Sequence, residues 1–380
     1  MTLKSIIESV ERRTSDKEKK KEEAAPSETP APSKPATKDD EELQKIVSSL
    51  KAKIKIVGCG GAGCNTVNRI VQEGIVGANL YALNSDAQHL LHIRSPNKIL
   101  IGRMATKGLG AGAVPRIGEE AALESQEEIR NKLQGSDLIF ITAGMGGGTG
   151  TGTAPVVSRI ARETGALTVG IVTFPFSGEG ILRRQNAEYG LSKLEPYTDT
   201  VIVIPNDKLL KIVPKLPLNA AFKVADEILM RALKGLTEMI TKVGLVNLDF
   251  ADFKNIMTGG GMAMIGLGES SAHRDKAVEA LNEAINSPLL DIDVSDAHGA
   301  LVCVTGGQSM SVSEAEKVAE EIHSRINPNA NIIWGAYIDD TLGDTMRVII
   351  VLTGVRSEQM SGRADGSIAD RSSLEIDMVR

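Results

Sequence analysis

The chain has 380 residues, of which 38 are glycine and only 3% are aromatic, and its formal net charge is −6. Three cysteines are too few for a disulfide scaffold, and no apolar run approaches the roughly 20 residues that span a bilayer. The glycines follow no three-residue period, which excludes a collagen-like chain, and the acidic balance gives no general attraction to nucleic acid.

Residues 1–50 are predicted to precede the folded body. Leu3, Ile6, Ile7 and Val10 recur at helical spacing and predict a short amphipathic helix. Residues 14–42 contain no Ile, Val, Leu, Met or Phe and predict a disordered linker. The helix either packs loosely on the body or anchors the chain to a partner or membrane surface, and both alternatives stay open.

From residue 51 onward, short β-branched runs alternate with helical patterns. This alternation predicts βαβ units in an α/β protein, with a Rossmann-like doubly wound parallel sheet over residues 51–218 and the strand order 3-2-1-4-5-6. The expected strands are 54–57, 80–83, 98–101, 138–142, 167–173 and 201–204, and the expected helices are 65–72, 117–133, 154–163 and 182–194.

A long helix is predicted over residues 219–243, where apolar side chains keep a 3.6-residue period. At 1.5 Å per residue this central helix spans roughly 37 Å, the width of a domain. A second, smaller α/β domain is expected over residues 244–355, with strands at 300–305, 331–338 and 346–353 and helices at 275–285 and 313–326. Residues 356–380 are polar and predict a flexible tail.

Glycine-rich segments follow the first, third and fourth expected strands, at residues 58–63, 108–113 and 144–152. One such segment often only closes a turn between a strand and a helix, and the GxGxxG at residues 58–63 alone is weak evidence. Three of them at one sheet edge predict a polyphosphate site, because glycine lets backbone N–H groups approach phosphate at helix N-termini. Cys59 and Cys64, which flank the glycines of the first segment, are expected to be small packing residues rather than a metal pair.

The chain has no GxxxxGK[ST] motif, so no Walker lysine is available for the phosphates. Backbone amides, threonine hydroxyls and a metal ion are therefore expected to neutralise them.

These motifs carry a resemblance to a known family. The run GGGTGTG at residues 146–152 resembles the signature of the tubulin/FtsZ superfamily. Residues 51–355 resemble FtsZ, its family of prokaryotic division GTPases, through GCGGAG at 58–63, NSDAQ at 84–88, GLGAG at 108–112, IPNDKLL at 204–210, NLDFAD at 247–252, AMIGLGE at 263–269 and SPLLD at 287–291. Trp334 in NIIWGA makes the chain more similar to archaeal members.

The resemblance implies GTP and GDP as ligands, with Mg²⁺ held mainly by phosphates and water and no metal-ligating side chains. Phe222 and Asp226 lie four residues apart on the long helix, so an aromatic ring and a carboxylate acceptor share one face, which suits guanine. Spacing alone favours Phe222 as an ordinary core residue and Asp226 as an ordinary surface residue, and it allows Glu179 and Arg183 to be an ordinary i,i+4 ion pair. By resemblance the nucleotide-binding residues are Gly60, Gly61, Ala62, Gly63, Cys64, Asn65, Ala111, Gly112, Ala113, Gly146, Gly147, Gly148, Thr149, Gly150, Thr151, Glu179, Arg183, Asn206, Phe222 and Asp226.

Asn247, Asp249 and Asp252 follow the long helix and are the candidate catalytic residues. Asp249 is alternatively the N-cap of the next helix, with Asp252 in its first turn. If the helix begins at the nucleotide, these carboxylates lie about 37 Å from it and reach only the phosphates of a neighbouring subunit in a head-to-tail stack. The resemblance implies that this segment completes the neighbour's site, where the carboxylates polarise a water and Asn247 positions it.

The function implied is a GTP-hydrolysing cytoskeletal protein that polymerises head to tail in the cytoplasm and forms the division ring at mid-cell. Its expected partners are its own copies and a membrane-tethering adaptor at a terminal segment, with no nucleic acid and no transmembrane segment of its own. Val114 and Arg116 depart from the family pattern near the expected γ-phosphate. The tail, LEIDMVR at residues 374–380, does not match the bacterial end peptide.

Two other functions compete with this one at the level of sequence. A Rossmann-type NAD enzyme needs an acidic residue about 20 positions after the first glycine, whereas Asp86 stands 28 positions after Gly58. A tubulin-like scaffold for cell shape, with weak hydrolysis, shares the fold, and the sequence leaves division and shape control unseparated.

Overall fold

The computed structural model describes residues 52–212, 218–242, 244–272, 275–290, 297–327 and 330–355. The predicted N-terminal helix, the linker and the tail lie outside these residues. The described part forms one ten-stranded sheet in the order β3-β2-β1-β4-β5-β6-β7-β10-β8-β9. Its first six strands confirm the predicted order 3-2-1-4-5-6, and all five pairings among them are parallel.

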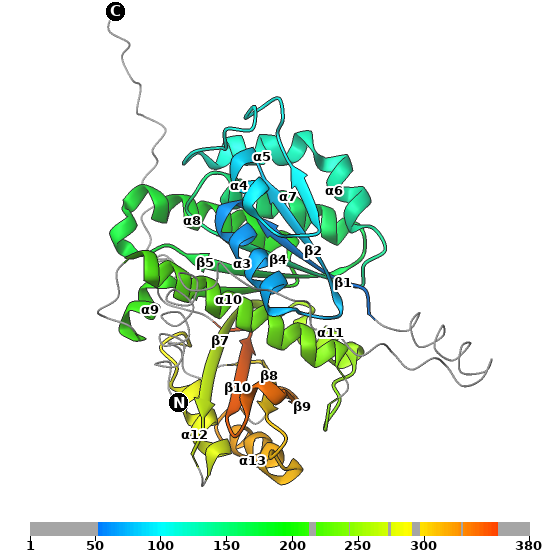
Figure 1. Cartoon of the computed structure of the whole chain (residues 1–380), viewed down its shortest axis with the longest axis vertical. Coiled ribbons are helices and arrows are strands. Elements are labelled where there is room, and N and C mark those ends of the chain that lie inside the picture. Colours follow the sequence, from blue (N-terminus) through cyan, green and yellow to red (C-terminus); the bar gives the residue numbers. More distant parts are fainter. Residues whose placement is uncertain are drawn as a thin grey trace, which may run out of the picture.

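The upper body in Figure 1 holds the six parallel strands and their helices. The elements in chain order are β1 (Ile54–Cys59), α3 (Gly60–Glu73), β2 (Ala78–Asn84), α4 (Ala87–His92), β3 (Asn97–Leu100), α5 (Pro115–Glu124), α6 (Gln126–Leu133), β4 (Leu138–Gly144), α7 (Thr149–Glu163), β5 (Leu167–Phe174), η1 (Ser177–Glu179), α8 (Ile181–Leu194), η2 (Glu195–Tyr197), β6 (Thr200–Pro205) and α9 (Asn206–Ile212).

Three expected helices differ clearly from the structure. The helix expected over residues 154–163 is α7, which begins five residues earlier at Thr149. The helix expected over residues 117–133 is two helices, α5 and α6, because the chain bends at Ser125 (φ −101°, ψ 13°). The helix expected from residue 65 begins at Gly60, five residues earlier, so Gly60, Gly61 and Gly63 are helical despite their low propensity.

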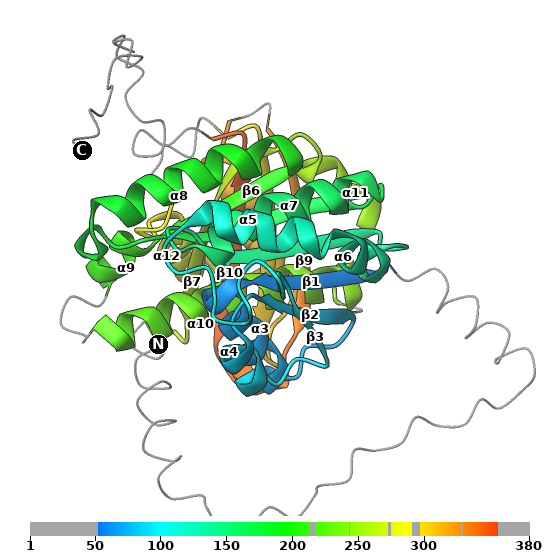
Figure 2. The same cartoon turned by 90° about the horizontal axis from the view of Figure 1, so that it is seen from above.

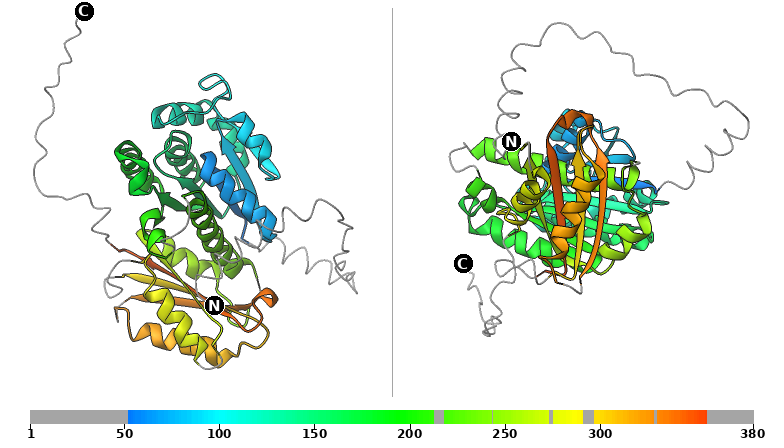
Figure 3. Two further views of the ribbon diagram at one scale, coloured as in Figure 1. Left: turned by 60° about the vertical axis from the view of Figure 1, so that its left-hand side comes forward. Right: turned by 90° about the horizontal axis from the view of Figure 1, so that it is seen from below.

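The lower body follows the long helix α10 (Leu218–Thr241), which lies between the two bodies (Figure 1). Seen from below, its strands face the viewer (Figure 3). Its elements are α11 (Phe250–Met257), β7 (Gly261–Ser270), α12 (Lys276–Ile285), β8 (Gly299–Gly306), α13 (Val312–His323), β9 (Asn331–Ile338), η4 (Asp340–Leu342) and β10 (Met346–Thr353). The predicted central helix is therefore confirmed, with its end two residues earlier than expected.

Strand β7 was not expected as a strand, because its sequence GMAMIGLGES carries three glycines. It pairs in parallel with β6 through Thr200, Val201 and Ile202, and antiparallel with β10 along eight residues, so the two bodies share one sheet. The glycines have a packing role. A Cβ on Gly268 would lie 2.0 Å from the carbonyl oxygen of Ala280, so only glycine lets α12 lie this close to β7.

Two helical layers cover the upper sheet (Figure 2). Side chains of α3 and α10 pack on one face of the sheet, and those of α5, α6, α7 and α8 pack on the other. The core beneath α10 continues into the lower body through Leu301, Ile349 and Val351. Because α10 contributes to a core on both of its sides, it fixes the spacing between the two bodies.

Replacement of Gly268 by alanine should lower the free energy of unfolding by about 2 kcal/mol, because the added methyl group forces α12 away from β7. Chemical denaturation followed by circular dichroism measures the change. Gly178→Ala is the matched control, because a Cβ there meets nothing within 4 Å and the residue has no positive φ. Equal stability of the two variants would contradict the close packing of α12.

Candidate functional site

The three glycine segments meet at the carboxyl ends of β1 and β4. Gly60 has a φ of +71°, and a Cβ there would lie 2.5 Å from the backbone nitrogen of Gly150. Only glycine therefore lets α3 and α7 begin this close together. On the other side, the N–H of Gly148 donates to the carbonyl of Gly112 at 2.9 Å. The expected gathering of the three segments is thus found in the structure.

The first turns of α3 and α7 leave backbone donors for a ligand. Neither helix has a side-chain cap, since Cys59 and Gly148 occupy the N-cap positions. Uncapped N–H groups and the helix dipole favour an anion at such ends. Gly61 and Gly147 face open space, because a Cβ on either would meet nothing within 4 Å. Two helix ends and an open glycine surface therefore suit phosphate groups without a lysine.

Hydroxyl and amide side chains hold the segments together. Thr149 Oγ1 lies 2.7 Å from Ser85 Oγ, and Thr151 Oγ1 accepts a hydrogen bond from the Gly146 N–H at 2.9 Å. Asn186 Nδ2 donates to the carbonyl oxygens of Ala113 at 2.9 Å and Gly146 at 3.3 Å. The Thr151 hydroxyl is therefore engaged inside its own segment. Asn186 was missed from the sequence, because an isolated asparagine within a helix has no spacing signal.

The predicted base contacts lie on and beside α10. Phe222 is 37% exposed and packs edge-on against Phe176, with ring centroids 5.3 Å apart. The contact with Phe176 thus holds the ring in place, while part of the side chain remains open for stacking. Asn206 is only 4% exposed, and its Oδ1 has no hydrogen-bond partner among the described residues. A buried acceptor without a donor fits a ligand that brings N–H groups, as guanine does.

Asp226 lies one turn after Phe222 with its carboxylate largely buried. Burial raises the pKa of Asp226 to about 7, and the nearby Glu227 adds to the rise, although Arg69 opposes it. The Arg69 Nε lies 3.8 Å from Asp226 Oδ2, and its Nη1 lies 3.1 Å from Glu227 Oε2. Arg69 was also missed from the sequence. A partner that donates N–H groups would stabilise the ionised form of this carboxylate.

Glu179 and Arg183 form the i,i+4 ion pair that spacing alone allows, at 2.6 Å. The pair is asymmetric, because the Glu179 side chain is 8% exposed and that of Arg183 is 51% exposed. Glu179 Oε1 also accepts from the Phe176 N–H at 2.9 Å, which ties η1 to the ring that supports Phe222. Arg183 is therefore the member of the pair that is open to a ligand.

The acidic segment lies beyond the far end of α10, and Asn247, Asp249 and Asp252 are all exposed. Asp249 is the N-cap of α11 and accepts from the Ala251 N–H at 3.1 Å, as the capping alternative predicts. Asn247 Oδ1 accepts from the Gly244 N–H at 2.7 Å. The Asp252 side chain makes no ion pair or hydrogen bond within the described part of the chain, so its carboxylate is the most available of the three.

The structure places the remaining predicted residues in four segments. Of the two residues that depart from the family pattern, Val114 is the N-cap of α5, and Arg116 pairs with Glu120 at 3.1 Å. The first turns of α3 carry Gly60, Gly61, Ala62, Gly63, Cys64 and Asn65, the segment before α5 carries Ala111, Gly112 and Ala113, the turn after β4 carries Gly146, Gly147 and Gly148, and the first turn of α7 carries Thr149, Gly150 and Thr151.

The cysteines of the first segment are buried free thiols. Burial raises the pKa of both Cys59 and Cys64, which disfavours the thiolate that a metal would need. Within the described ranges, no group of three or more His, Cys, Asp or Glu side chains is placed to hold a metal ion. No described helix is both long enough and apolar enough to cross a membrane.

Comparison with known proteins places this site in a family context. Residues 53–214 match the model of the Tubulin/FtsZ family GTPase domain, and residues 261–356 match that of the FtsZ family C-terminal domain. The chain is 56% identical over 341 residues to cell division protein FtsZ 1 of Archaeoglobus fulgidus, covering 90% of this chain and 92% of the relative. It is 58% identical over 346 residues to cell division protein FtsZ of Haloferax mediterranei, covering 89% and 92%.

Among solved structures, the chain is similar to an empty FtsZ dimer from M. jannaschii. The TM-score is 0.81 at 55% identity, and the match covers 84% of this chain and 93% of the other. The archaeal relatives agree with the archaeal resemblance of the sequence around Trp334.

The titration of Asp226 predicts how GTP affinity should change with pH. If guanine N–H groups donate to this carboxylate, its ionised form is stabilised and the pKa of Asp226 should fall below about 7 on binding. Affinity should then be constant above pH 7 and weaken roughly tenfold per pH unit below it, until the lower pKa of the complex is reached. Calorimetric titration of the protein with GTP between pH 5.5 and 8 measures this slope.

Asp226→Asn is the control for the pH titration, because an amide keeps one acceptor and does not titrate in this range. Its affinity should be weaker than that of the wild type at pH 8 and nearly independent of pH. The same slope in Asp226→Asn and the wild type would assign the titration to another group.

Proposed function

Because the chain belongs to the tubulin/FtsZ family, we propose that its subunits stack head to tail and that each GTPase site is completed by the acidic segment of a neighbour. The protein is a GTPase that polymerises and forms the cell-division ring. The alternative of a Rossmann-type NAD enzyme is therefore wrong. The FtsZ from M. jannaschii is described as a dimer, which supports self-association of this chain as well.

The observation that carries the proposal is the separation imposed by α10. Phe222 and Asp226 lie in the first turns of this helix, and Asn247, Asp249 and Asp252 follow its end. A helix of 24 residues is about 36 Å long. The acidic residues therefore cannot reach phosphates bound beside α3 and α7 in their own subunit. They are exposed, as residues that act on a neighbour must be.

Exposed apolar side chains support contacts at the nucleotide end. Met104 and Leu109 are 80% and 84% exposed in the segment between β3 and α5, and Ile181 and Leu182 are 77% and 62% exposed at the start of α8. Leu245 is 42% exposed beside the acidic segment. Apolar groups at both ends of a molecule favour a heterologous contact that repeats without closing, which builds a filament.

In the proposed reaction, a water of the interface attacks the γ-phosphorus in line with the bond to the β-phosphate. Asp252 of one subunit accepts the proton of that water, and the bond between the γ-phosphorus and the bridging oxygen breaks to leave GDP and phosphate. Asn247 positions the water. Asp249, whose Oδ1 caps α11, contributes negative charge and holds the segment in place.

The same proposal assigns the nucleotide contacts within one subunit. The amides of Gly60, Gly61, Ala62, Gly63, Cys64 and Asn65 and those of the GGGTGTG run receive the phosphates, Arg183 and Glu179 contact phosphate and ribose, and Asn206, Phe222 and Asp226 hold the guanine. A Mg²⁺ ion would be held mainly by phosphate oxygens and water, because the described part of the site offers hydroxyls rather than a carboxylate cluster. When bound, the ion would neutralise charge on the phosphates.

We further propose that a terminal segment of the chain binds a membrane-tethering adaptor and that the protein acts in the cytoplasm at a mid-cell ring. The support is the family role in division, together with polar termini whose sequences lie outside the described residues. The proposal includes no nucleic-acid partner, in keeping with the net charge of −6.

A fluorescent fusion that lacks residues 356–380 should form cytoplasmic filaments away from the envelope if the tail is the attachment.

The shared site predicts that GTP hydrolysis per subunit depends on protein concentration. Phosphate release should be negligible below a threshold concentration and should rise steeply above it, where filaments sediment. Asp252→Ala should bind GTP and assemble with near wild-type affinity but turn over at least a hundredfold more slowly, since a positioned base contributes 10²–10⁴-fold. A rate per subunit that is constant with concentration would refute the shared site.

Mixing two inactive variants tests whether the acidic segment of one subunit acts on the nucleotide of another. Asp252→Ala keeps the nucleotide pocket and lacks the base, whereas Phe222→Ala with Asp226→Ala keeps the base and lacks the guanine contacts. A mixture should hydrolyse GTP, because the acidic segment of the second variant completes the pocket of the first. If each variant is inactive alone and the mixture remains inactive, the carboxylate serves its own subunit.

A further inference from the structure

A stripe of charged side chains runs along α10 beside its apolar contacts with the lower body, and this stripe is largely buried. Glu227, Arg231, Lys234 and Glu238 recur at i, i+4, i+7 and i+11, so they form one stripe along the helix. Their side chains are only 6%, 13%, 20% and 4% exposed. Burial of four charged side chains in a row costs free energy unless each one is paired.

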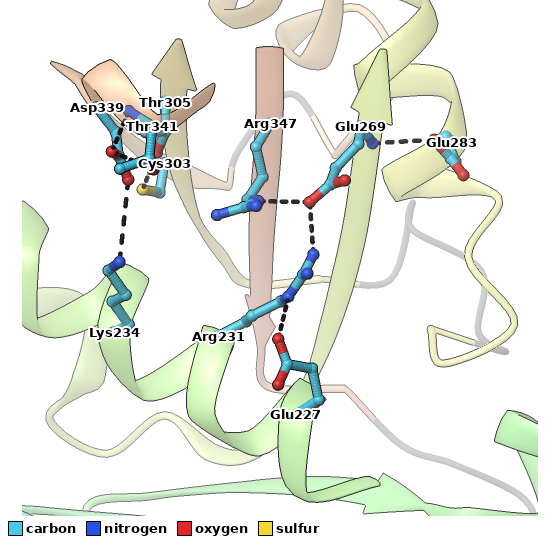
Figure 4. Close-up of polar contacts among 10 residues, drawn as sticks. All are labelled: Glu227, Arg231, Lys234, Glu269, Glu283, Cys303, Thr305, Asp339, Thr341 and Arg347. Atoms are coloured by element: carbon cyan, nitrogen blue, oxygen red, sulfur yellow. Dashed lines mark hydrogen bonds and ion pairs between the residues drawn. The ribbon is translucent and has the colours of Figure 1, made fainter. Parts of the chain in front are cut away.

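Arg231 is the residue of this stripe that bridges the two bodies (Figure 4). Its Nε lies 3.1 Å from Glu227 Oε1 on the same helix, and its Nη1 lies 2.6 Å from Glu269 Oε1 on β7. The same oxygen of Glu269 also lies 2.6 Å from Arg347 Nε on β10. Arg347 stands directly opposite Glu269 in the antiparallel pairing of β7 and β10. Oε1 of Glu269 thus contacts two arginines, Arg231 from the helix and Arg347 from the sheet.

A second contact fixes the same helix farther along. Lys234 Nζ lies 3.9 Å from Asp339 Oδ2, just past the end of β9, as Figure 4 also shows. Strand β9 in turn holds the chain that leads to the acidic segment, through paired backbone hydrogen bonds of 3.1 Å between Val246 and Ala336. The position of residues 247–252 therefore depends on how α10 is seated against β7, β9 and β10.

Ion pairs and apolar contacts constrain such a seat differently. Apolar side chains tolerate small shifts along a helix, whereas a guanidinium shared by two carboxylates has one geometry. Buried ion pairs add little stability relative to well-packed apolar residues. A gain in folding stability therefore does not explain why α10 carries this stripe. A defined register between α10 and the lower body is what these contacts supply.

We infer that Arg231, together with Glu269 and Arg347, is a positioning site for GTP hydrolysis between subunits: it holds α10 in the register that sets the acidic segment against the neighbour's nucleotide. This inference rests on the proposed shared site. The distance between the guanine-binding residues at the start of α10 and the acidic segment after its end is then set by the Arg231 bridge as well as by the length of the helix.

Arg231→Met tests the inference cleanly, because it cuts the bridge and leaves the other charges paired. Glu227 keeps Arg69 at 3.1 Å, and Glu269 keeps Arg347 at 2.6 Å. Sedimentation and phosphate release should show a critical concentration raised at least threefold and a turnover per assembled subunit lowered at least fivefold. GTP affinity of the monomer should stay within twofold. Arg231→Lys, which retains the charge but reaches fewer acceptors, should fall between Arg231→Met and the wild type.

Arg325→Met is the matched control. Arg325 is also a partly buried arginine, paired with Glu321 at 2.6 Å and with Asn282, but all its partners lie within the lower body. It should lower the unfolding temperature as much as Arg231→Met while leaving turnover and critical concentration unchanged.

Three results separate the possible failures. Wild-type turnover and threshold in Arg231→Met, or in Arg231→Lys if the methionine variant does not fold, would overturn the positioning role. An equal loss of monomer GTP affinity would also overturn it, because the residue would then act on the nucleotide pocket. A wild-type rate independent of concentration would overturn the shared site itself, and this inference with it.

Discussion

The structure depends on one helix that is buried on both sides. The apolar side chains of α10, among them Ile228, Leu229 and Leu236, join the upper sheet and the strands of the lower body in a single core. Neither body can shift along the helix without exposing part of that core to water, which costs roughly 25 cal/mol per Å² of apolar surface. The separation between the two ends of α10 is therefore a property of the fold, and the reaction proposed here follows from it.

At the upper end of the molecule, the constraint is the close approach of backbones. Gly60 meets Gly150, and Gly148 meets the carbonyls of Ala111 and Gly112, at distances that exclude any side chain. These contacts bring two uncapped helix ends to one point without a basic residue between them. In the proposed site, backbone amides would orient the phosphates through hydrogen bonds, while Arg183 and a Mg²⁺ ion would supply the positive charge.

Periodicity and glycine spacing predicted most of this fold. Buried parallel strands are continuous apolar runs and amphipathic helices repeat apolar residues every 3.6 positions, so both are visible in the sequence. The six strands and the long helix needed nothing else, whereas the strand order rests on the usual arrangement of doubly wound sheets. The sequence did not reveal strand β7, whose Gly266 and Gly268 are required by the backbone of α12 and lower its strand propensity. The contacts of Arg69 and Asn186 also could not be predicted, since each depends on which elements meet in space and neither residue belongs to a spaced motif.

The charged stripe on α10 needs an explanation that apolar packing does not give. An apolar stripe would join the bodies as firmly, since Ile349 and Val351 already pack under the same helix. Arg231 and Lys234 instead reach acceptors on different elements, Glu269 on β7 and Asp339 beyond β9. Two such contacts oppose sliding and rotation of α10 against the lower body. In the proposed shared site, the base and the substrate lie on different subunits, so an error in the position of α10 would add along the filament. A register set by ion pairs would limit that error.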